Sequence, residues 1–270
     1  MLLQCLSLGE NGVKMILRGE LQRNLLDNLR ALTLYFSSNE FEYEFLKQVP
    51  NTEKLVVCDG SFKKMFCCES PNNVDYSGLL LQLKILHLKS LKNLVSIGLE
   101  NSWAVVKNLE TFEVISFSSL ENLVSCKVSF SNLICLKVKS CDRLSYLFTS
   151  STARSLTQLK RIKIKECQSI KEIVFKEEEE KELDEIMFPN LSCLILDSLS
   201  HLRRFYKGSL SFPILEELSV KKCNEMVTLC AGTIETNKLS QITINYDEGI
   251  PLKNNLNFTM RKNFLKQVCI

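Results

Sequence analysis

The strongest candidates for a binding site are basic residues that alternate with apolar residues along two short stretches. These stretches are Leu136-Lys137-Val138-Lys139 and Arg161-Ile162-Lys163-Ile164-Lys165. Alternation with a period of two is typical of a β-strand that buries one face. The five basic side chains should therefore be neighbours on the solvent face of two adjacent strands. Like charges side by side on a sheet are mildly destabilising, so their accumulation favours an acidic partner; the alternative is a merely solvated face.

Equivalent positions in other strands carry three more candidates, His87, Lys89 and Lys221. We call the complete set the basic surface, and it is our candidate partner-binding site. Its members are His87, Lys89, Lys137, Lys139, Arg161, Lys163, Lys165 and Lys221.

Cysteine is the other residue type that could bind a ligand, and the chain contains 12 cysteines. Zinc sites need closely spaced ligand pairs, but no C-x-x-C pair occurs and the only histidines are His87 and His201. The vicinal pair Cys67-Cys68 could be redox-active, although an incidental loop pair is favoured. We therefore expect no metal site and no cofactor, and scattered cysteines of this kind favour reduced thiols in the cytoplasm.

Catalytic motifs are missing from the sequence. It contains no G-x-x-x-x-G-K-[ST] phosphate loop, no G-x-G-x-x-G, no G-x-S-x-G and no H-E-x-x-H. Nothing pairs a nucleophile with a base and an orienting group, as catalysis requires. We expect no catalytic residues, and we predict that the chain is not an enzyme.

The elements that position the basic surface follow from a repeat of apolar residues. The template is L-x-x-L-x-L-x-x-(C or apolar)-x-x-L-x-x-L, and its clearest copy contains Leu133, Leu136, Val138, Cys141 and Leu144. Successive copies begin 26, 24, 26, 32, 24 and 24 residues apart, at Leu83, Leu109, Leu133, Leu159, Leu191, Leu215 and Leu239. Leucine-rich repeats have periods of 20–29 residues. The sequence, with 45 leucines among 270 residues, is therefore predicted to form such repeats.

The spacing within a copy predicts its structure. The L-x-L step of two indicates a short strand, and the following steps of three suit short helical or 3₁₀ returns. One repeat cannot bury its own leucines, so stacked repeats should form an α/β solenoid, a leucine-rich-repeat horseshoe, with a parallel β-sheet on its concave side. Cys141, Cys167 and Cys223 occupy the ninth template position and are predicted to be small buried side chains. With only nine glycines and five prolines, the turns should depend on repeat packing rather than on special backbone conformations.

We divide the chain into a degenerate leading repeat or cap (1–28), about nine repeats (29–245) and a C-terminal cap (246–270). The step of 32 contains an acidic stretch at 177–185, for which a solvated loop is favoured. No apolar stretch approaches the roughly 20 residues of a membrane span. A net charge of +3, and the lack of aromatic residues among the lysines, weigh against nucleic-acid binding.

Two stretches of the repeats resemble a known family, the coiled-coil nucleotide-binding disease-resistance proteins, which are intracellular immune receptors of plants. The stretches are 133–151 and 156–174, the second followed by the acidic stretch. Phe188-Pro189-Asn190-Leu191 and Phe212-Pro213-Ile214-Leu215-Glu216 resemble that family's F-P-x-L-E repeat starts. The resemblance covers about residues 25–260. The second repeat departs from it, because Thr52 replaces a leucine and Gly60 the ninth-position cysteine.

The resemblance implies a protein-recognition module that acts in plant defence and innate immunity. In that family the repeats sense pathogen effectors or a guarded host protein and restrain the nucleotide-binding domain of the full-length receptor. The chain contains neither the coiled-coil nor the nucleotide-binding domain, so we expect no ATP binding of its own. An alternative is the leucine-rich-repeat substrate-receptor module of a ubiquitin ligase, but residues 1–28 are too short for the F-box which that class needs.

Overall fold

The fold is described from a computed structural model, which covers residues 3–20, 25–41, 43–65, 79–98, 107–124, 128–177 and 184–268. Cys67-Cys68 and positions 178–183 of the acidic stretch lie outside the described residues. The strands of the main sheet are β1 (Cys5–Gly9), β2 (Ala31–Tyr35), β3 (Lys54–Cys58), β4 (Ile85–Lys89), β5 (Thr111–Phe117), β6 (Cys135–Cys141), β8 (Arg161–Lys165), β11 (Cys193–Asp197), β13 (Glu217–Lys221), β15 (Gln241–Ile244) and β16 (Asp247–Pro251). The other elements are α1 (Glu10–Leu17), α2 (Tyr43–Leu46), β7 (Phe148–Thr149), α4 (Ser150–Arg154), β9 (Val174–Phe175), β10 (Glu185–Met187), β12 (Ser209–Ser211), β14 (Ile234–Glu235) and α5 (Leu256–Val268).

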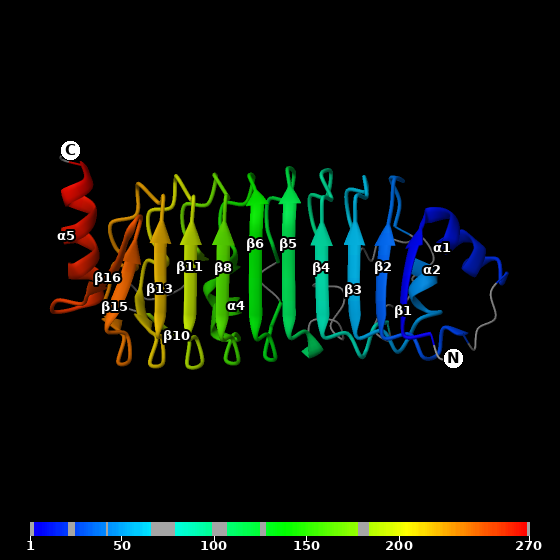
Figure 1. The fold of residues 1–270 in the computed structure, drawn as a ribbon, viewed down its shortest axis with the longest axis horizontal. Helices are drawn as coiled ribbons and strands as arrows, with labels where there is room; N and C mark the ends of the chain where they lie inside the picture. The colour runs from blue at the N-terminus through cyan, green and yellow to red at the C-terminus, as the bar shows by residue number, and fades with distance from the viewer. Residues whose placement is uncertain are drawn as a thin grey trace.

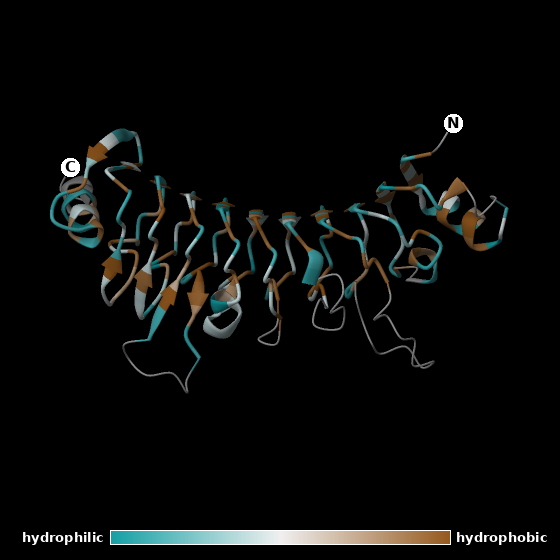
Figure 2. Ribbon diagram, turned by 90° about the horizontal axis from the view of Figure 1, so that it is seen from below, coloured by the Kyte–Doolittle hydropathy of each residue, from teal (hydrophilic) through white to brown (hydrophobic). Residues whose placement is uncertain are grey.

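The main sheet runs the length of the molecule with its strands in chain order (Figure 1). Every strand from β1 to β15 is parallel to its neighbours, and equivalent repeat positions pair, as Leu136 does with Ile162 and Ile162 with Leu194. Figure 2 shows a shallow arc with the strands along the inner edge and the returns on the outer side. The predicted leucine-rich-repeat solenoid with a concave parallel sheet is therefore confirmed.

The core consists of the template residues stacked from one repeat to the next. In the six copies that begin between Leu83 and Leu215, every apolar template position is at most 2% exposed. Burying a side chain of this size stabilises the fold by about 1.5–3 kcal/mol. Because each repeat contacts mainly its neighbours, this burial is collective and depends on an unbroken stack.

The turn after each strand departs from the prediction, because it does use a special backbone conformation. The residue that follows the strand, or the last but one residue in the longer strands β5 and β6, has a positive φ of 51–65° in eight repeats. These residues are Asp59, Ser90, Ser116, Ser140, Glu166, Ser198, Lys222 and Asn245. A left-handed conformation costs a residue with a Cβ roughly 1–2 kcal/mol. The chain therefore contains few glycines because residues with a Cβ bear this cost in the turns, not because the turns avoid the left-handed conformation.

The returns also differ from the prediction of helical or 3₁₀ segments. Most are extended and pair with the next return: β7 with β9, and β10 with β12 and β12 with β14, all parallel. Leu147 N–H, for example, donates to the carbonyl of Ile173 at 3.0 Å. Stacked repeats bring equivalent backbone segments side by side, so their polar groups can be satisfied between repeats as well as within a helical turn. The helical segments between strands are, among the described residues, α1, α2, α4 and residues 107–108.

The second repeat fills its degenerate positions in two ways. Thr52 is fully buried, and its hydroxyl donates to the carbonyl of Val49 at 3.0 Å. At Gly60 a Cβ would collide with the ring of Phe62, so this ring occupies the space of the missing ninth-position side chain. Phe62 also packs against the rings of Phe36 and Phe41 at centroid distances of 6.0 and 5.4 Å.

The two ends of the stack are covered by different elements. At the first end β1 pairs with β2, and α1 buries Val13 and Ile16. At the last end β16 pairs antiparallel with β15, and α5 buries Leu256 and Met260. None of the described helices combines the length and the apolar character of a membrane span.

Both described ends of the acidic stretch are attached to the fold, which differs from a purely solvated loop. The carboxylate of Glu177 accepts hydrogen bonds from the hydroxyl of Ser150 and the N–H of Ser151, both at 3.0 Å, at the start of α4. Asp184 forms an ion pair with Arg154 at 3.5 Å. The insertion therefore begins and ends at fixed points beside α4.

Candidate protein-binding surface

The basic surface lies on the concave face of the main sheet, because its residues alternate with the buried leucines of four strands. His87 and Lys89 lie on β4, and Lys221 lies on β13. The other five are contiguous on β6 and β8, where Lys137 is in register with Lys163 and Lys139 with Lys165. Arg161 begins β8 opposite Cys135. The structure thus brings together the five residues that the alternation predicts to be neighbours and separates them from His87, Lys89 and Lys221.

Glu113 on β5 separates the histidine from the lysines and contacts both. Lys137 Nζ lies 2.8 Å from Glu113 Oε1, and His87 Nε2 lies 3.6 Å from Glu113 Oε2. Burial raises the pKa of the Glu113 carboxyl, but the hydrogen bond from Lys137 and the charge of His87 outweigh burial and lower it. Burial lowers the pKa of His87 despite the adjacent carboxylate. His87 is therefore mainly neutral at pH 7 and adds little positive charge to the surface.

Three further carboxylates neutralise the outer row of lysines. Lys139 pairs with Glu166 at 3.4 Å, and Lys165 pairs with Asp197 at 3.2 Å. Lys221 approaches Glu248 at 3.9 Å. The lysine side chains remain about 40% exposed in these pairs, so each pair contributes little to stability and can exchange its partner at low cost.

Two bases at the centre of the surface lack such a partner. Among the described residues, no ion pair involves Arg161 or Lys163. The nearest acids in register are each two strands away: Glu113 from Lys163, and Glu217 from Arg161. Glu217 accepts a hydrogen bond from the thiol of Cys193 at 3.1 Å. Burial and this bond raise the pKa of Cys193 to about 11, so it stays a neutral thiol.

The concave face carries both basic and acidic side chains. Its parallel strands present eight basic and three acidic side chains, a net charge of +5, which Glu166 and Glu248 beside them reduce to +3, equal to the net charge of all 270 residues. The basic ones are the lysines and the arginine of the basic surface together with Lys54, and the acidic ones are Glu113, Asp197 and Glu217. The excess of basic side chains favours association with an acidic surface.

The predicted ninth-position cysteines are buried and chemically quiet. Each thiol of Cys141, Cys167 and Cys223 donates to the carbonyl two residues earlier, at 3.2–3.3 Å. A hydrogen bond between the side chains of Cys141 and Cys167, together with burial, raises the pKa of Cys141, and burial raises that of Cys223 to about 12. In the described part of the chain, no three His, Cys, Asp or Glu side chains gather in a way that could hold a metal ion.

The remaining histidine is engaged in a return. His201 Nδ1 lies 2.6 Å from the carbonyl oxygen of Gln168. The residues that sequence reasoning missed are the neutralising acids Glu113, Glu166 and Asp197. A signal existed for Glu113 and Asp197, because each lies on a strand at an offset where a neighbouring repeat carries lysine. Glu166 follows its strand at an offset where the neighbouring repeats carry serine. Charge pairing across strands nevertheless requires the register, which the repeat spacing supplies only when adjacent copies are aligned.

Comparison with known proteins shows which repeat proteins this chain is similar to. A family model described as "Plant disease resistance protein RPS2-like, leucine-rich repeats" matches residues 125–246. Among solved structures, the leucine-rich repeat domain of the type III effector XopL aligns with 88% of this chain and 71% of its own, at 15% identity and a TM-score of 0.38.

Similar curated proteins come from Arabidopsis thaliana. Two probable disease resistance proteins are each 25% identical and cover 76% and 75% of this chain. Disease resistance protein UNI is 27% identical over 58% of the chain. The matches span 35%, 20% and 17% of these relatives, so the chain corresponds to about a third of their length or less. The match over residues 125–246 and these relatives show that the repeats of this chain are similar to the leucine-rich repeats of plant disease resistance proteins, as the resemblance in the sequence predicts.

Proposed function

We propose that this chain is the protein-recognition part of a plant disease-resistance protein and that it senses a pathogen effector or a guarded host protein. The family match, the exposed concave sheet and the uneven distribution of charge support this role. We further propose that it acts in the cytoplasm, has no catalytic activity of its own, and contacts the nucleotide-binding domain of a full-length receptor.

The observation that carries the proposal is the pair of bases Arg161 and Lys163, which form no ion pair with a described residue and lie among the other bases of the basic surface. An acidic partner would find an exposed arginine and a half-buried lysine, and no ion pair with a described residue would have to be broken. The surrounding lysines, held by Glu166 and Asp197 in weak exposed pairs, can turn toward the same partner. Complementary charge of this kind contributes mainly to association rate and specificity.

The test compares two double variants with the same change in net charge. Arg161→Glu with Lys163→Glu reverses the centre of the basic surface. Lys92→Glu with Lys107→Glu is the matched control, because both lysines are exposed and lie outside the main sheet. Each tagged protein is used for co-purification from infected and healthy plant tissue, and the captured protein is then purified for affinity measurement.

We expect the central variant to bind the captured protein with a Kd raised by about tenfold or more, equivalent to about 1.4 kcal/mol. The control variant should bind it with the wild-type Kd. The wild-type affinity should fall with rising salt because screening weakens exposed charge contacts. Equal binding by both variants, or an affinity that salt does not change, would show that recognition uses another surface.

A further inference from the structure

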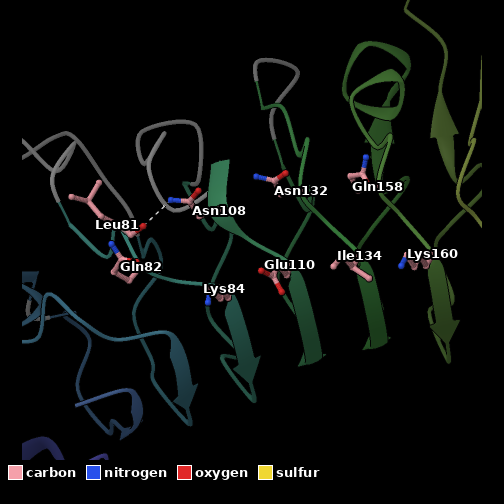
Figure 3. A pocket seen from close by; sticks show the side chains of 9 residues that line it. All are labelled: Leu81, Gln82, Lys84, Asn108, Glu110, Asn132, Ile134, Gln158 and Lys160. Atoms are coloured by element: carbon pink, nitrogen blue, oxygen red, sulfur yellow. Dashed lines mark hydrogen bonds between the residues drawn. The ribbon is translucent and has the colours of Figure 1, made fainter. Parts of the chain in front are cut away.

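A groove of about 380 Å³ crosses the flank of the solenoid, at the edge where strands β4 to β8 begin (Figure 3). It is separate from the concave face and is lined by two rows of side chains from four successive repeats. One row consists of the primary amides Gln82, Asn108, Asn132 and Gln158, each just before a template leucine. The other row consists of the residues just after that leucine, Lys84, Glu110, Ile134 and Lys160.

The two asparagines of the amide row are held in a fixed orientation by the fold. Asn108 Nδ2 donates to the carbonyl of Leu81 at 2.7 Å, as Figure 3 shows, and Asn132 Nδ2 donates to that of Lys107 at 2.8 Å. A carboxamide has two N–H donors and an oxygen acceptor. Each asparagine uses one donor within the protein, so a second N–H and the oxygen remain for a ligand. The orientation of these two amides is already set, which lowers the entropic cost of binding.

The charged row contains two side chains available to a ligand. Lys84 is paired with Glu53 at 3.4 Å, whereas no described residue forms an ion pair with Glu110 or Lys160. These residues immediately precede β5 and β8, and Ile134 precedes β6 between them. Neighbouring strands are about 4.8 Å apart, so Glu110 and Lys160 are separated by about 9.6 Å along the groove.

We propose that this groove binds an extended polypeptide segment in the polyproline II conformation, with a basic and an acidic side chain three residues apart. Polyproline II has three residues per turn and a rise of about 3.1 Å, so residues i and i+3 lie on one side at about 9.3 Å. That spacing matches the separation of Glu110 and Lys160. A β-strand fits less well, because its same-side neighbours i and i+2 are only about 6.8 Å apart.

The backbone of such a segment suits the amide row. Polyproline II makes no internal hydrogen bonds, so its carbonyls are free to accept from the second N–H of each carboxamide. Ile134 offers an apolar contact between the two charges. The inference goes beyond the proposed recognition by the concave face, since it uses different residues on a different side of the solenoid.

The experiment uses the full chain and three synthetic peptides with blocked ends and a proline host. The first carries Lys and Glu three residues apart, the second carries them two residues apart, and the third carries Glu at both of the first peptide's charged positions. Binding is followed by fluorescence anisotropy of labelled peptides. Glu110→Lys tests the charged row, Gln158→Ala tests the amide row without removing a hydrogen bond within the described structure, and Lys163→Glu on the concave face is the control.

We expect the first peptide to bind at least tenfold more tightly than the second, and Glu110→Lys to reverse the preference toward the third peptide. Gln158→Ala should weaken binding of the first peptide, and Lys163→Glu should leave its affinity unchanged. Circular dichroism shows whether each variant is folded. Absence of binding at millimolar peptide, equal binding at both spacings, or a preference that Glu110→Lys does not reverse would overturn the proposal. None of these results depends on whether the concave face binds an acidic partner.

Discussion

Reversing the charge of two adjacent lysines separates the paired part of the basic surface from its unpaired centre. Lys137 and Lys163 are in register on neighbouring strands, and both lie on the concave face of the main sheet. Lys137 donates to Glu113 at 2.8 Å, whereas no described residue forms an ion pair with Lys163. The same substitution, Lys137→Glu or Lys163→Glu, should therefore have different effects on stability.

The magnitudes follow from the surroundings of each lysine. The side chains of Lys137 and Glu113 are 42% and 14% exposed, so losing their partly buried pair should cost about 1 kcal/mol. Placing a second carboxylate beside Glu113 should cost about another 1 kcal/mol, because the new side chain can turn into solvent. Lys137→Glu is thus expected to lower the free energy of unfolding by about 2 kcal/mol. Lys163→Glu replaces a like-charge cross-strand neighbour with an opposite one and should change it by at most about 0.5 kcal/mol.

Urea unfolding followed by circular dichroism measures both changes, with the midpoint shift multiplied by the mean slope. The gap between the two variants should shrink in high salt, because screening weakens both the pair and the repulsion. A loss for Lys163→Glu as large as that for Lys137→Glu would refute the reasoning. It would mean that Lys163 has a structural role, and that substitutions at the unpaired centre of the basic surface do change the free energy of unfolding.

Three further predictions concern the backbone, the core and pH. Lys222→Gly should raise the free energy of unfolding by about 0.5–1 kcal/mol in urea titration, because the position has a φ of 51°; a decrease would contradict the strain argument. Phe62→Ala should lower it by about 3–5 kcal/mol, since the ring fills the space above Gly60, and Gly60→Cys added to that variant should restore part of the loss. Stability should fall as pH drops below 6.5, because the lowered pKa of His87 makes the unfolded chain bind the proton more readily. His87→Gln should flatten that dependence just below pH 6.5, and an unchanged slope would exclude His87 as its source.

The prediction of the fold from sequence succeeded where one physical rule acts in every repeat. The L-x-L step and the ninth-position cysteines identified strands and buried thiols because apolar burial is repeated with a nearly constant period. The prediction failed for the conformation of the returns and of the turns. An extended return and a helical return bury the same leucines, so the template cannot distinguish them. The positive φ at Ser140 or Glu166 also leaves no mark in residue type, because serine, lysine and glutamate occupy those positions here and glycine does not.

For the candidate site, the alternating lysines of β6 and β8 were recognised as neighbours from their spacing alone. Their partners were not recognised, because Glu113, Glu166 and Asp197 lie 24 to 32 residues away from the lysines they contact. The amide row on the flank was also missed. Its residues precede the template leucines and look like ordinary polar turn residues until the stack places them side by side.

The solenoid, the strand positions and the face on which the basic residues lie can all be predicted from the residues alone, because they follow from the period of apolar burial. Which charges remain available to a partner depends on how the repeats stack. Stacking brings residues about one repeat apart within 4 Å, so it neutralises Lys137, Lys139 and Lys165 and leaves Arg161 and Lys163 without ion-pair partners among the described residues. The availability of a charge depends on distances between repeats, which local pattern does not encode.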